Sequence, residues 1–440
     1  MKPLDSNLLK ETSSDREMDL DLDLIALRRD FHQHPEVGFT EFRTASKVVE
    51  VLQSLGYDVI YGQDAMDGAS RRGLPDEDVL NKAYERALKD GANPDILKNM
   101  QGGYTAVIGV LNGKNAGPTV GFRFDMDALP ILESETSDHL PAASGFRSVY
   151  EGNMHACGHD GHTSIGLGLA QKLTDKAFNG TVKLIFQPAE EGVRGAYSIV
   201  NKGMLDDVNT LFCHHLGTNV PSGEVHGGSS GFLATTKLAA YFYGESSHAG
   251  ATPEKGRNAL LGAATALLNI HALPRFSSSD TRVNVGVLEG GKAANIIPDS
   301  SKMIIETRAE SEEVNTDLEK RVRTIIAHSA GMHGLDYKIE TIGGAIPISC
   351  DQELVDLVVQ EAETMNAFSS VKPVIYSNSL GSEDASFMIR RVQENGGQGT
   401  YIKIGSNIPA PHHHPKFDID EAMLKPAVDL FYKLAKRKLQ

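Results

Sequence analysis

The stretch TVKLIFQPAEEGVRGAYSIV, residues 181–200, carries the pattern that decides the predicted fold. Its apolar start predicts a strand at residues 181–187, and residues 192–201 predict the helix that follows. A helix is also predicted from just after Gly161 to about Leu173, and the next strand at residues 210–213. Strands that alternate with helices are typical of parallel βαβ units, with helices on both faces of one sheet.

The N-terminal part of the chain predicts two helices and three further strands. Apolar residues recur at helical spacing between residues 20 and 55, and the second helix is predicted to be capped at its start by Thr40 and stopped by Gly56. Strands are predicted at residues 57–61, 105–111 and 119–124. Between the first two strands, residues 62–103 are polar and contain a charged helical pattern, which indicates an inserted surface subdomain.

The order of predicted elements changes after GGSSG, residues 227–231, a stretch that predicts a flexible break. The next elements are, in order, a strand at 233–243, a helix at 257–273, strands at 281–288 and 302–309, a helix at 312–328 and a strand at 336–342. This β-α-β-β-α-β order is that of the ferredoxin-like split motif, so we expect a second domain inserted within the first. The tail from Asp351 is predicted to be rich in helices, with one more strand at 399–404.

The predicted fold is therefore α/β, with a mostly parallel sheet flanked by helices and an inserted ferredoxin-like α+β domain. The main domain is predicted to comprise residues 18–229, including the insert at 62–103, together with residues 345–440. The inserted domain is predicted to span residues 230–344.

Composition excludes several classes of function. The 440 residues include 43 Lys+Arg and 58 Asp+Glu, giving a formal net charge of −15. This balance disfavours nucleic acid and anionic membranes as partners, because both need clustered positive charge. The sequence has no apolar run of the about 18 residues that suggest a membrane span, and no signal segment is visible. Three cysteines are too few for a disulfide framework, so we expect a cytoplasmic protein.

Side chains able to bind metal ions follow several of the predicted strands. Open parallel sheets bind ligands outside the carboxyl ends of their strands, so these side chains are expected at one edge. The candidates are Asp125 and Asp127, Glu190 and Glu191, His214 and His215, His412–His414, and the run His155, Cys157, His159, Asp160 and His162. Each has an ordinary structural explanation when taken singly, such as a turn or a helix cap. Together they indicate a metal site.

The donor types indicate which ions this site would take. Imidazole, thiolate and carboxylate together suit Zn²⁺, Mn²⁺, Co²⁺ or Ni²⁺, whereas Mg²⁺ and Ca²⁺ prefer oxygen ligands. More donors are present than one tetrahedral ion can accept, which predicts two ions about 3.5–4 Å apart. Such a pair activates a bridging water, and a carboxylate that is not a ligand must then carry the proton. The neighbours Glu190 and Glu191 fit this division, one as ligand and one as base.

Other catalytic schemes have little support. Cys157 lies among histidines that look more like metal ligands than like one half of a Cys–His dyad. The sequence also lacks a G-x-S-x-G elbow, a phosphate loop ending in GK[ST] and the C-x-x-C of the zinc deaminases.

Six strings of the sequence resemble those of a known enzyme family. They are FRFDMDALP (122–130), MHACGHDGHT (154–163), LIFQPAEEG (184–192), SSHAG (246–250), GSEDAS (381–386) and HHPKFDID (413–420). Over nearly the whole chain the sequence resembles the metal-dependent amidohydrolases of the aminoacylase and carboxypeptidase G superfamily, in the branch of the amino-acid-conjugate and hippurate hydrolases. The insert with SRRGLPDE (70–77) and GGYTAVIG (102–109) is similar to that of the p-aminobenzoyl-glutamate hydrolases within this branch.

The resemblance implies roles for individual residues. Glu190 would be the general base, and Asp125 and Asp127 would orient the metal ligands from behind. The implied ligands of two Mn²⁺ or Zn²⁺ ions are Cys157, His159, Glu191, His215 and His413. Among its neighbours, His413 has the family's spacing to the following proline and phenylalanine, and His215 is preferred over the preceding histidine because an apolar residue follows it.

The resemblance also implies that the inserted domain is a lid and dimerisation domain on a zinc-peptidase-like catalytic domain. His248 would stabilise the oxyanion in an active site, that of a partner subunit, while Asn295 and Arg308 would hold the carboxylate of the substrate. Plain structural alternatives remain, because His248 could cap a loop and Arg308 could pair with a carboxylate of the lid.

The expected function is hydrolysis of the amide bond in N-acyl amino acids, with p-aminobenzoyl-glutamate cleaved to p-aminobenzoate and glutamate. One alternative is a general N-acyl-amino-acid, hippurate or auxin-conjugate hydrolase that uses the same site. Another is an inactive metal-binding subunit that supports a related active one. The expected partners are a small-molecule substrate and, through the lid, a second subunit in a homodimer or heterodimer.

Overall fold

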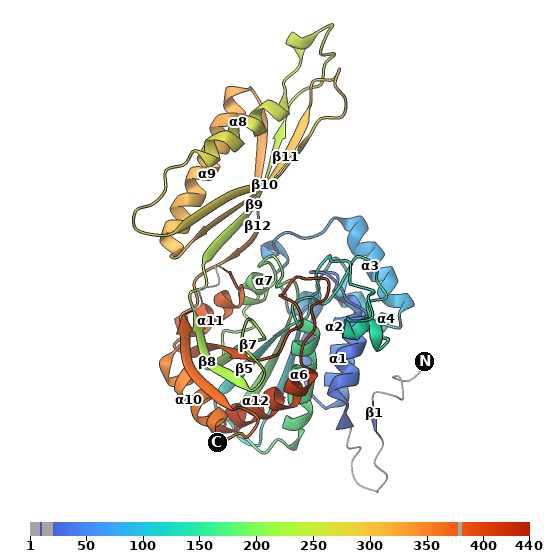
Figure 1. The fold of residues 1–440 in the computed structure, drawn as a ribbon, viewed down its shortest axis with the longest axis vertical. Coiled ribbons are helices and arrows are strands. Elements are labelled where there is room, and N and C mark those ends of the chain that lie inside the picture. Colours follow the sequence, from blue (N-terminus) through green and yellow to red (C-terminus); the bar gives the residue numbers. More distant parts are fainter. Residues whose placement is uncertain (1–8, 11–20, 377–380) are drawn as a thin grey trace.

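The structure, a computed structural model, describes residues 9–10, 21–376 and 381–440. Figure 1 shows a large domain around one sheet and a smaller, elongated domain that projects from it. The chain enters the small domain at β9 (Ala234–Tyr243) and leaves it at β12 (Asp336–Ala345), and these two strands are paired. Within the described ranges, no helix is both long enough and apolar enough to cross a membrane.

Among the described residues, the large domain is built on an eight-stranded sheet with the order β13-β8-β14-β7-β5-β6-β4-β3. The strands are β3 (Asp58–Tyr61), β4 (Val107–Asn112), β5 (Thr119–Asp125), β6 (Thr181–Gln187), β7 (Thr210–Leu216), β8 (Glu224–Ser230), β13 (Ser370–Tyr376) and β14 (Gln398–Ile404). The pairs β5–β6, β5–β7, β7–β14 and β8–β13 are parallel, and the remaining pairs are antiparallel. The expected α/β fold with a mostly parallel sheet is confirmed.

Helices cover both faces of this sheet. One face carries α1 (Leu24–Gln33), α2 (Phe42–Ser54), α6 (His159–Lys172), α10 (Gln352–Glu363) and α12 (Leu424–Lys438). The other face carries α7 (Ala196–Asn201) and α11 (Ala385–Glu394). Apolar side chains such as Phe122, Phe124 and Phe431 are fully buried between the sheet and the first group. Burial of this apolar surface is the main force that holds the layers together.

The insert at residues 62–103 packs on the large domain. It contains α3 (Glu77–Lys89) and α4 (Pro94–Leu97), both of which contact α2. Ala83, Ala87 and Leu97 are buried in the same core as the sheet, while the outer face of α3 is exposed and mostly polar. Two short strands, β1 (Leu9–Lys10) and β2 (Asp21–Leu22), and the one-turn helix α5 (Leu140–Ala143) complete this domain.

The small domain has an antiparallel sheet with the order β10-β11-β9-β12. Its elements follow the chain as β9, α8 (Ala259–His271), β10 (Thr281–Gly290), β11 (Ser300–Ala309), α9 (Glu312–Met332) and β12. Both helices pack on the sheet through a separate core that includes Leu238, Ala263 and Ile326. The expected ferredoxin-like motif is confirmed.

One predicted loop is a strand. The GGSSG stretch at 227–231, expected to be a flexible break, forms most of β8, which lies between β13 and β14. A Cβ atom at Gly227 would lie 2.6 Å from the carbonyl oxygen of Val355, and one at Gly228 would lie 2.7 Å from the Val355 side chain. These glycines therefore allow α10 to approach the sheet closely, and they do not loosen the chain.

Several other elements also differ from prediction. β7 continues to Leu216 and so contains both histidines that were expected to follow it. α6 begins at His159, and not after Gly161. α2 begins at Phe42 because the Thr40 hydroxyl donates to the carbonyl of Val37 and does not cap the helix. β13 lies in the tail, where only β14 is expected as a strand.

Candidate metal centre

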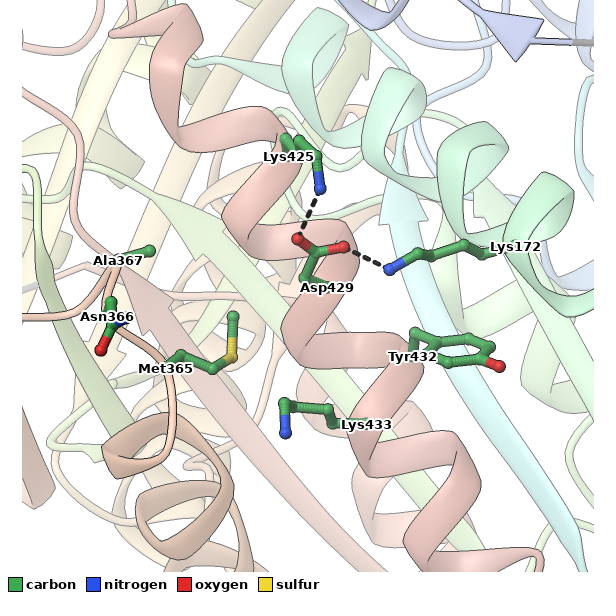
Figure 2. A pocket seen from close by; sticks show the side chains of 8 residues that line it. All are labelled: Lys172, Met365, Asn366, Ala367, Lys425, Asp429, Tyr432 and Lys433. Atoms are coloured by element: carbon green, nitrogen blue, oxygen red, sulfur yellow. Dashed lines mark hydrogen bonds and ion pairs between the residues drawn. The ribbon is translucent and has the colours of Figure 1, made fainter.

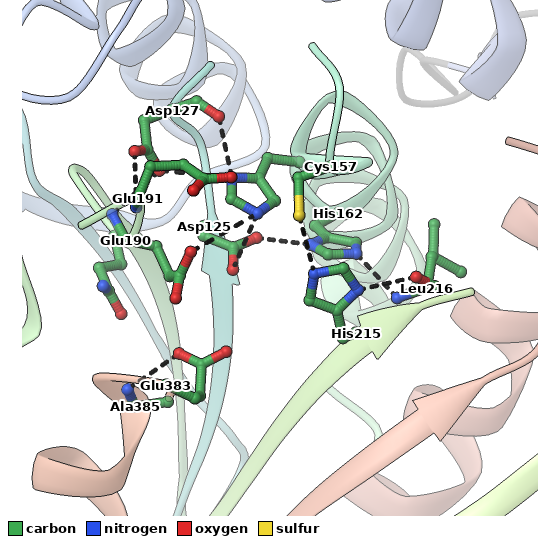
Figure 3. Close-up of polar contacts among 12 residues, drawn as sticks. Asp125, Asp127, Cys157, His162, Glu190, Glu191, His215, Leu216, Glu383 and Ala385 are labelled. Atoms are coloured by element: carbon green, nitrogen blue, oxygen red, sulfur yellow. Dashed lines mark hydrogen bonds and ion pairs between the residues drawn. The ribbon is translucent and has the colours of Figure 1, made fainter. Parts of the chain in front are cut away.

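Side chains from separate segments meet at the carboxyl edge of the large sheet (Figure 3). They come from the end of β5 (Asp125), the loop after β6 (Glu190 and Glu191), the end of β7 (His215), the start of α6 (His159) and the loop after β14 (His413). Gly158, with φ +96°, precedes α6 and turns the chain sharply. A glycine suits this left-handed conformation, which places Cys157 and His159 at the same edge.

Cys157, His159 and His215 form one group whose donor atoms lie within 4.8 Å of one another. The Cys157 Sγ atom is 3.4 Å from Nε2 of His215. In both histidines Nδ1 faces a backbone carbonyl, that of Asp127 at 2.8 Å from His159 and that of Leu216 at 2.7 Å from His215. A proton on each Nδ1 leaves the lone pair of Nε2 free, which is the arrangement of a histidine ready to bind a metal.

Cys157, Glu191 and His413 form a second group that shares the thiol with the first. Nε2 of His413 lies 3.3 Å from Oε1 of Glu191. His413 has φ +65°, and its backbone N–H donates to the carbonyl of Ala156 at 2.8 Å. This contact fixes the histidine loop against the Cys157 loop. The structure thus brings together all five side chains that were expected to be ligands.

Several buried polar atoms at this site make no hydrogen bond to any described residue. They include Nε2 of His159 and Oε1 of Glu191, the latter of which lies 3.3 Å from Nε2 of His413. Burying a polar atom without a partner costs free energy, so such atoms are rare and call for an explanation. A divalent ion bound between them would supply the missing partner, and the set of thiol, imidazole and carboxylate donors fits such an ion.

Asp127 holds the loop that carries the two glutamates. One oxygen of its carboxylate accepts the backbone N–H of Glu190 at 3.0 Å, and the other accepts that of Glu191 at 2.9 Å. Ala189, just before them, has φ +51°, and its N–H donates to the buried carboxylate of Glu41. Two carboxylates therefore fix a tight turn, so the adjacent glutamates are presented in different directions.

Asp125 lies beneath the first group of donors. Its carboxylate is 2.5 Å from Nδ1 of His162 and 2.6 Å from Nη1 of Arg123, and it lies 3.7 Å from Nε2 of His159. Burial by itself raises the pKa of Asp125, but the charge of Arg123 and the neighbouring histidines lower it well below its usual range. Asp125 therefore places a fixed negative charge behind the site.

Glu190 faces the same space without a hydrogen bond to its side chain from any residue in the described ranges. Its carboxylate lies 4.0 Å from Nε2 of His159. Burial raises the pKa of Glu190 well above its usual range, and the nearby charges of Glu383 and Glu191 act in the same direction. Positive ions beside it would oppose this effect. A carboxyl group with a raised pKa in a cleft is typical of general acid–base chemistry.

A buried polar cluster behind Glu190 was not anticipated as part of the site. Nη2 of Arg123 donates to Glu383 at 3.0 Å, and the hydroxyl of Tyr401 donates to the other oxygen of Glu383 at 2.6 Å. Glu190, Glu383 and Asp384 bring their carboxylates within 4.8 Å of one another. Two features of the sequence could have indicated this cluster, namely the GSEDAS string and an arginine in the middle of the apolar strand β5.

Alternation along β7 explains why one histidine of the His214–His215 pair reaches the site and the other does not. Neighbouring side chains of a strand point to opposite faces of a sheet. His214 donates from Nδ1 to the carbonyl of Arg123 at 3.2 Å and packs against Phe124 and Phe431 in the core. His215 therefore points into the site.

Of the three residues of the small domain expected at the active site, two lie away from it. His248 and Asn295 are exposed and lie in adjacent loops, where the N–H of Ala249 donates to the carbonyl of Asn295. Neither of them lines the cavity beside the metal-binding groups, whereas Arg308 does. Arg308 also pairs with Glu306 of its own strand, at 2.9 Å from Nε.

The cavity beside Glu190 has a volume of about 310 Å³ and is lined by both domains. Three of its lining side chains are cationic, namely Lys237, Arg308 and Lys403. A second hollow, between α6, α12 and the residues that follow α10, is shown in Figure 2. Its one carboxylate, Asp429, is bonded to Lys172 and Lys425, and its eight lining residues include no histidine or cysteine. Of these two hollows, the first is therefore the one that contains metal-binding side chains.

Comparison with known proteins agrees with this geometry. Residues 121–437 match the family profile of Peptidase family M20/M25/M40. Indole-3-acetyl-aspartic acid hydrolase of Enterobacter agglomerans is 44% identical over 91% of this chain and 92% of its own length. A p-aminobenzoyl-glutamate hydrolase subunit of Escherichia coli K12 is 43% identical over 93% of this chain and 94% of its own length.

Solved structures extend the agreement to the fold. The crystal structure of the aminobenzoyl-glutamate utilization protein from Klebsiella pneumoniae has a TM-score of 0.82 at 39% identity and covers 94% of this chain and 95% of that one. YxeP of Bacillus subtilis, described as a dinuclear metal-binding peptidase of the M20 family, has a TM-score of 0.62 at 25% identity and covers 94% and 97%. The chain therefore belongs to Peptidase family M20/M25/M40 and is a metal-dependent amidohydrolase.

Proposed function

We propose that the protein hydrolyses the amide bond of N-acyl amino acids, and that its substrate is p-aminobenzoyl-glutamate, which it cleaves to p-aminobenzoate and glutamate. The observation that carries this proposal is the position of Glu190. Its carboxylate lies beside the grouped metal-binding side chains, in a cavity that also contains cationic groups. The two relatives at 43% and 44% identity, named as hydrolases of an acyl-glutamate and an acyl-aspartate, support the choice of an acidic amino acid.

We propose that the site binds two Mn²⁺ or Zn²⁺ ions. Their ligands are Cys157, His159, Glu191, His215 and His413. Nε2 of His159, which makes no hydrogen bond to a described residue, supports this assignment, as do the backbone carbonyls that face Nδ1 of His159 and His215. When bound, such ions polarise the scissile carbonyl and lower the pKa of a water ligand. A reducing, cytoplasmic setting suits the free thiol of Cys157.

The protein's own groups then carry the proton and hold the substrate. Glu190 accepts a proton from the attacking water and passes it to the nitrogen of the leaving amino acid. Asp127 keeps the Glu190–Glu191 loop in place, and Asp125 keeps His159 and His162 in place. Arg308 leaves Glu306 and binds the α-carboxylate of the substrate, because its planar guanidinium can form two parallel hydrogen bonds to a carboxylate.

We further propose that the small domain is a lid that joins two subunits, in a homodimer or in a heterodimer with a related chain. β10 is an edge strand of the described sheet. On α8, the side chains of Leu261 and Leu268 are 52% and 69% exposed. Exposed edges and apolar side chains of this kind favour pairing with another chain. In such a dimer His248 and Asn295, which are exposed and outside their own cavity, act in the cavity of the neighbouring subunit. The Escherichia coli relative, whose name makes it one subunit of a hydrolase, supports a partner chain.

Two other functions remain as alternatives. The relative at 44% identity supports indole-3-acetyl-aspartate, and with it a general acyl-amino-acid or auxin-conjugate hydrolase. The second alternative is an inactive metal-binding subunit. The position of Glu190 speaks against it, since a protein without activity has no use for a base beside its metal site.

One experiment separates these functions. We would measure bound metal by elemental analysis and compare kcat/KM on p-aminobenzoyl-glutamate, indole-3-acetyl-aspartate, hippurate and N-acetyl amino acids. Two ions per chain and the highest kcat/KM on p-aminobenzoyl-glutamate are the expected result. A preference for another member of the panel would move the assignment to the first alternative. Bound metal without hydrolysis, with activity only after a related chain is added, would support the second.

A further inference from the structure

Lys403 is a buried lysine that has no counter-charge among the residues that the structure describes. It lies on β14, in register with His215 of β7, and is 7% exposed. Its side chain lines the cavity beside Glu190, on the same face of β14 as Tyr401. Its ammonium group makes no hydrogen bond or ion pair with any residue in the described ranges, and lies 5.8 Å from the centre of the Phe232 ring.

Two other lysines, one similarly buried and one in the same cavity, each have an anionic partner, whereas Lys403 has none within the described part of the chain. Lys183 of β6 is buried to a similar degree, at 9% exposed, but its ammonium bonds to Asp207 at 2.5 Å and to the carbonyl of Met204 at 3.1 Å. Lys237, also in the cavity, lies 3.9 Å from Glu306. A buried lysine is almost always paired, because removing its charge from water is costly. Burial without an opposing anion lowers the pKa of Lys403.

We propose that Lys403 binds the side-chain carboxylate of the amino acid half of the substrate, and that it makes the cavity selective for acyl-glutamate and acyl-aspartate over neutral acyl amino acids. This inference rests on the proposed function. Arg308 enters the cavity from the small domain, whereas Lys403 enters it from the large sheet. An acidic amino acid carries two carboxylates, so one can meet each cation. The overall charge of −15 would repel such a dianion, and these local cations counteract that repulsion.

The expected selectivity follows from the ion pair between Lys403 and the side-chain carboxylate of the substrate. A charge-assisted hydrogen bond in a cavity shielded from water discriminates by about 10- to 100-fold against an analogue that cannot form it. Glutamine has the shape of glutamate but lacks the charge, so its acyl derivative would leave Lys403 unpaired. Arg308 would still bind the α-carboxylate, which both compounds share.

The test compares p-aminobenzoyl-glutamate with p-aminobenzoyl-glutamine on the metal-loaded enzyme. Lys403→Met keeps the length and removes the charge, and we expect kcat/KM on the glutamate compound to fall about 10- to 100-fold with little change on the glutamine compound. Lys403→Arg should recover part of the selectivity. Lys183→Met removes a lysine of equal burial in the same sheet, and its ratio between the two compounds should equal that of the wild type. Equal losses on both compounds in Lys403→Met would overturn the inference.

Calorimetric binding of the same two compounds keeps this result separate from the proposed function. If the wild type hydrolyses no acyl amino acid, the proposed function fails, and the binding constants still test Lys403. Weaker binding of the glutamate compound to Lys403→Met than to the wild type, with the glutamine compound unchanged, supports the inference. Binding that does not differ between the two proteins, including no binding to either, overturns it.

Discussion

Asp127→Asn is the substitution that most directly tests how the metal-binding loop is held. Each carboxylate oxygen of Asp127 accepts one backbone N–H, that of Glu190 at 3.0 Å and that of Glu191 at 2.9 Å. Asparagine keeps the shape but replaces one oxygen with an NH₂ donor, which then faces an N–H donor in a buried site. Losing one hydrogen bond to a charged acceptor costs about 1.5–3 kcal/mol. We expect the free energy of unfolding to fall by about 2 kcal/mol in consequence.

The same change should weaken metal binding, because Glu191 is a proposed ligand. Loss of a group that orients a ligand typically reduces affinity by about 10- to 100-fold. The measurements are competition with a chelator for affinity and denaturant unfolding for stability. Asp138→Asn is the matched control, since Asp138 is 70% exposed, pairs with Lys416 and lies outside the site. If Asp127→Asn binds metal with wild-type affinity, the proposed role of Asp127 is refuted.

Three further predictions concern the base, the lid and the pH dependence of stability. Glu190→Gln should leave the metal content unchanged and lower kcat by about 10²-fold or more, and near-normal turnover would contradict its role as base. Arg308→Ala should raise KM strongly for p-aminobenzoyl-glutamate and little for its α-amide; equal effects on both would remove Arg308 from carboxylate binding. Burial lowers the pKa of His32, but its hydrogen bonds to Asp160 and Glu133 prevail and raise it to about 9. The stabilisation from His32 is therefore complete below about pH 6.5 and is lost as the pH rises to about 9, by about 3 kcal/mol at most. The difference in unfolding free energy between wild type and His32→Gln should shrink over this range, and a constant difference would show that His32 is uncharged in the folded protein.

The fold could be predicted well wherever local pattern and tertiary environment agree. β6 occupies the predicted residues 181–187 because its apolar side chains are buried on both faces of a sheet, the environment that such a run favours. The βαββαβ order of the small domain was also visible, because each element is long and ends at clear turn residues. At the site, the sequence predicted that the metal-binding side chains lie at one edge of the sheet, because most of them follow predicted strands.

Predictions failed where the same residue type occurs in two opposite kinds of local structure. The glycines at 227 and 228 indicated a flexible break, yet in β8 they are needed because Val355 approaches closely. Histidines 214 and 215 suggested the end of β7, since polar residues usually end a buried strand, but the strand continues through them. In the cluster of Arg123, Glu383 and Tyr401, Arg123 lies 260 residues before Glu383, so a local pattern could mark each residue but could not show that they meet.

The cavity is formed by two bodies that meet, and this has a consequence for inhibitor design. Lys237 and Arg308 belong to the small domain, while Glu190 and His413 belong to the large one, and the connections between the domains are the adjacent ends of β9 and β12. A molecule that fills the cavity therefore contacts both domains at once. A compound with a chelating head and an anionic tail on a rigid spacer would contact Glu191 and His413 of the large domain and Lys237 and Arg308 of the small one, whereas a smaller fragment would contact only one of the two domains.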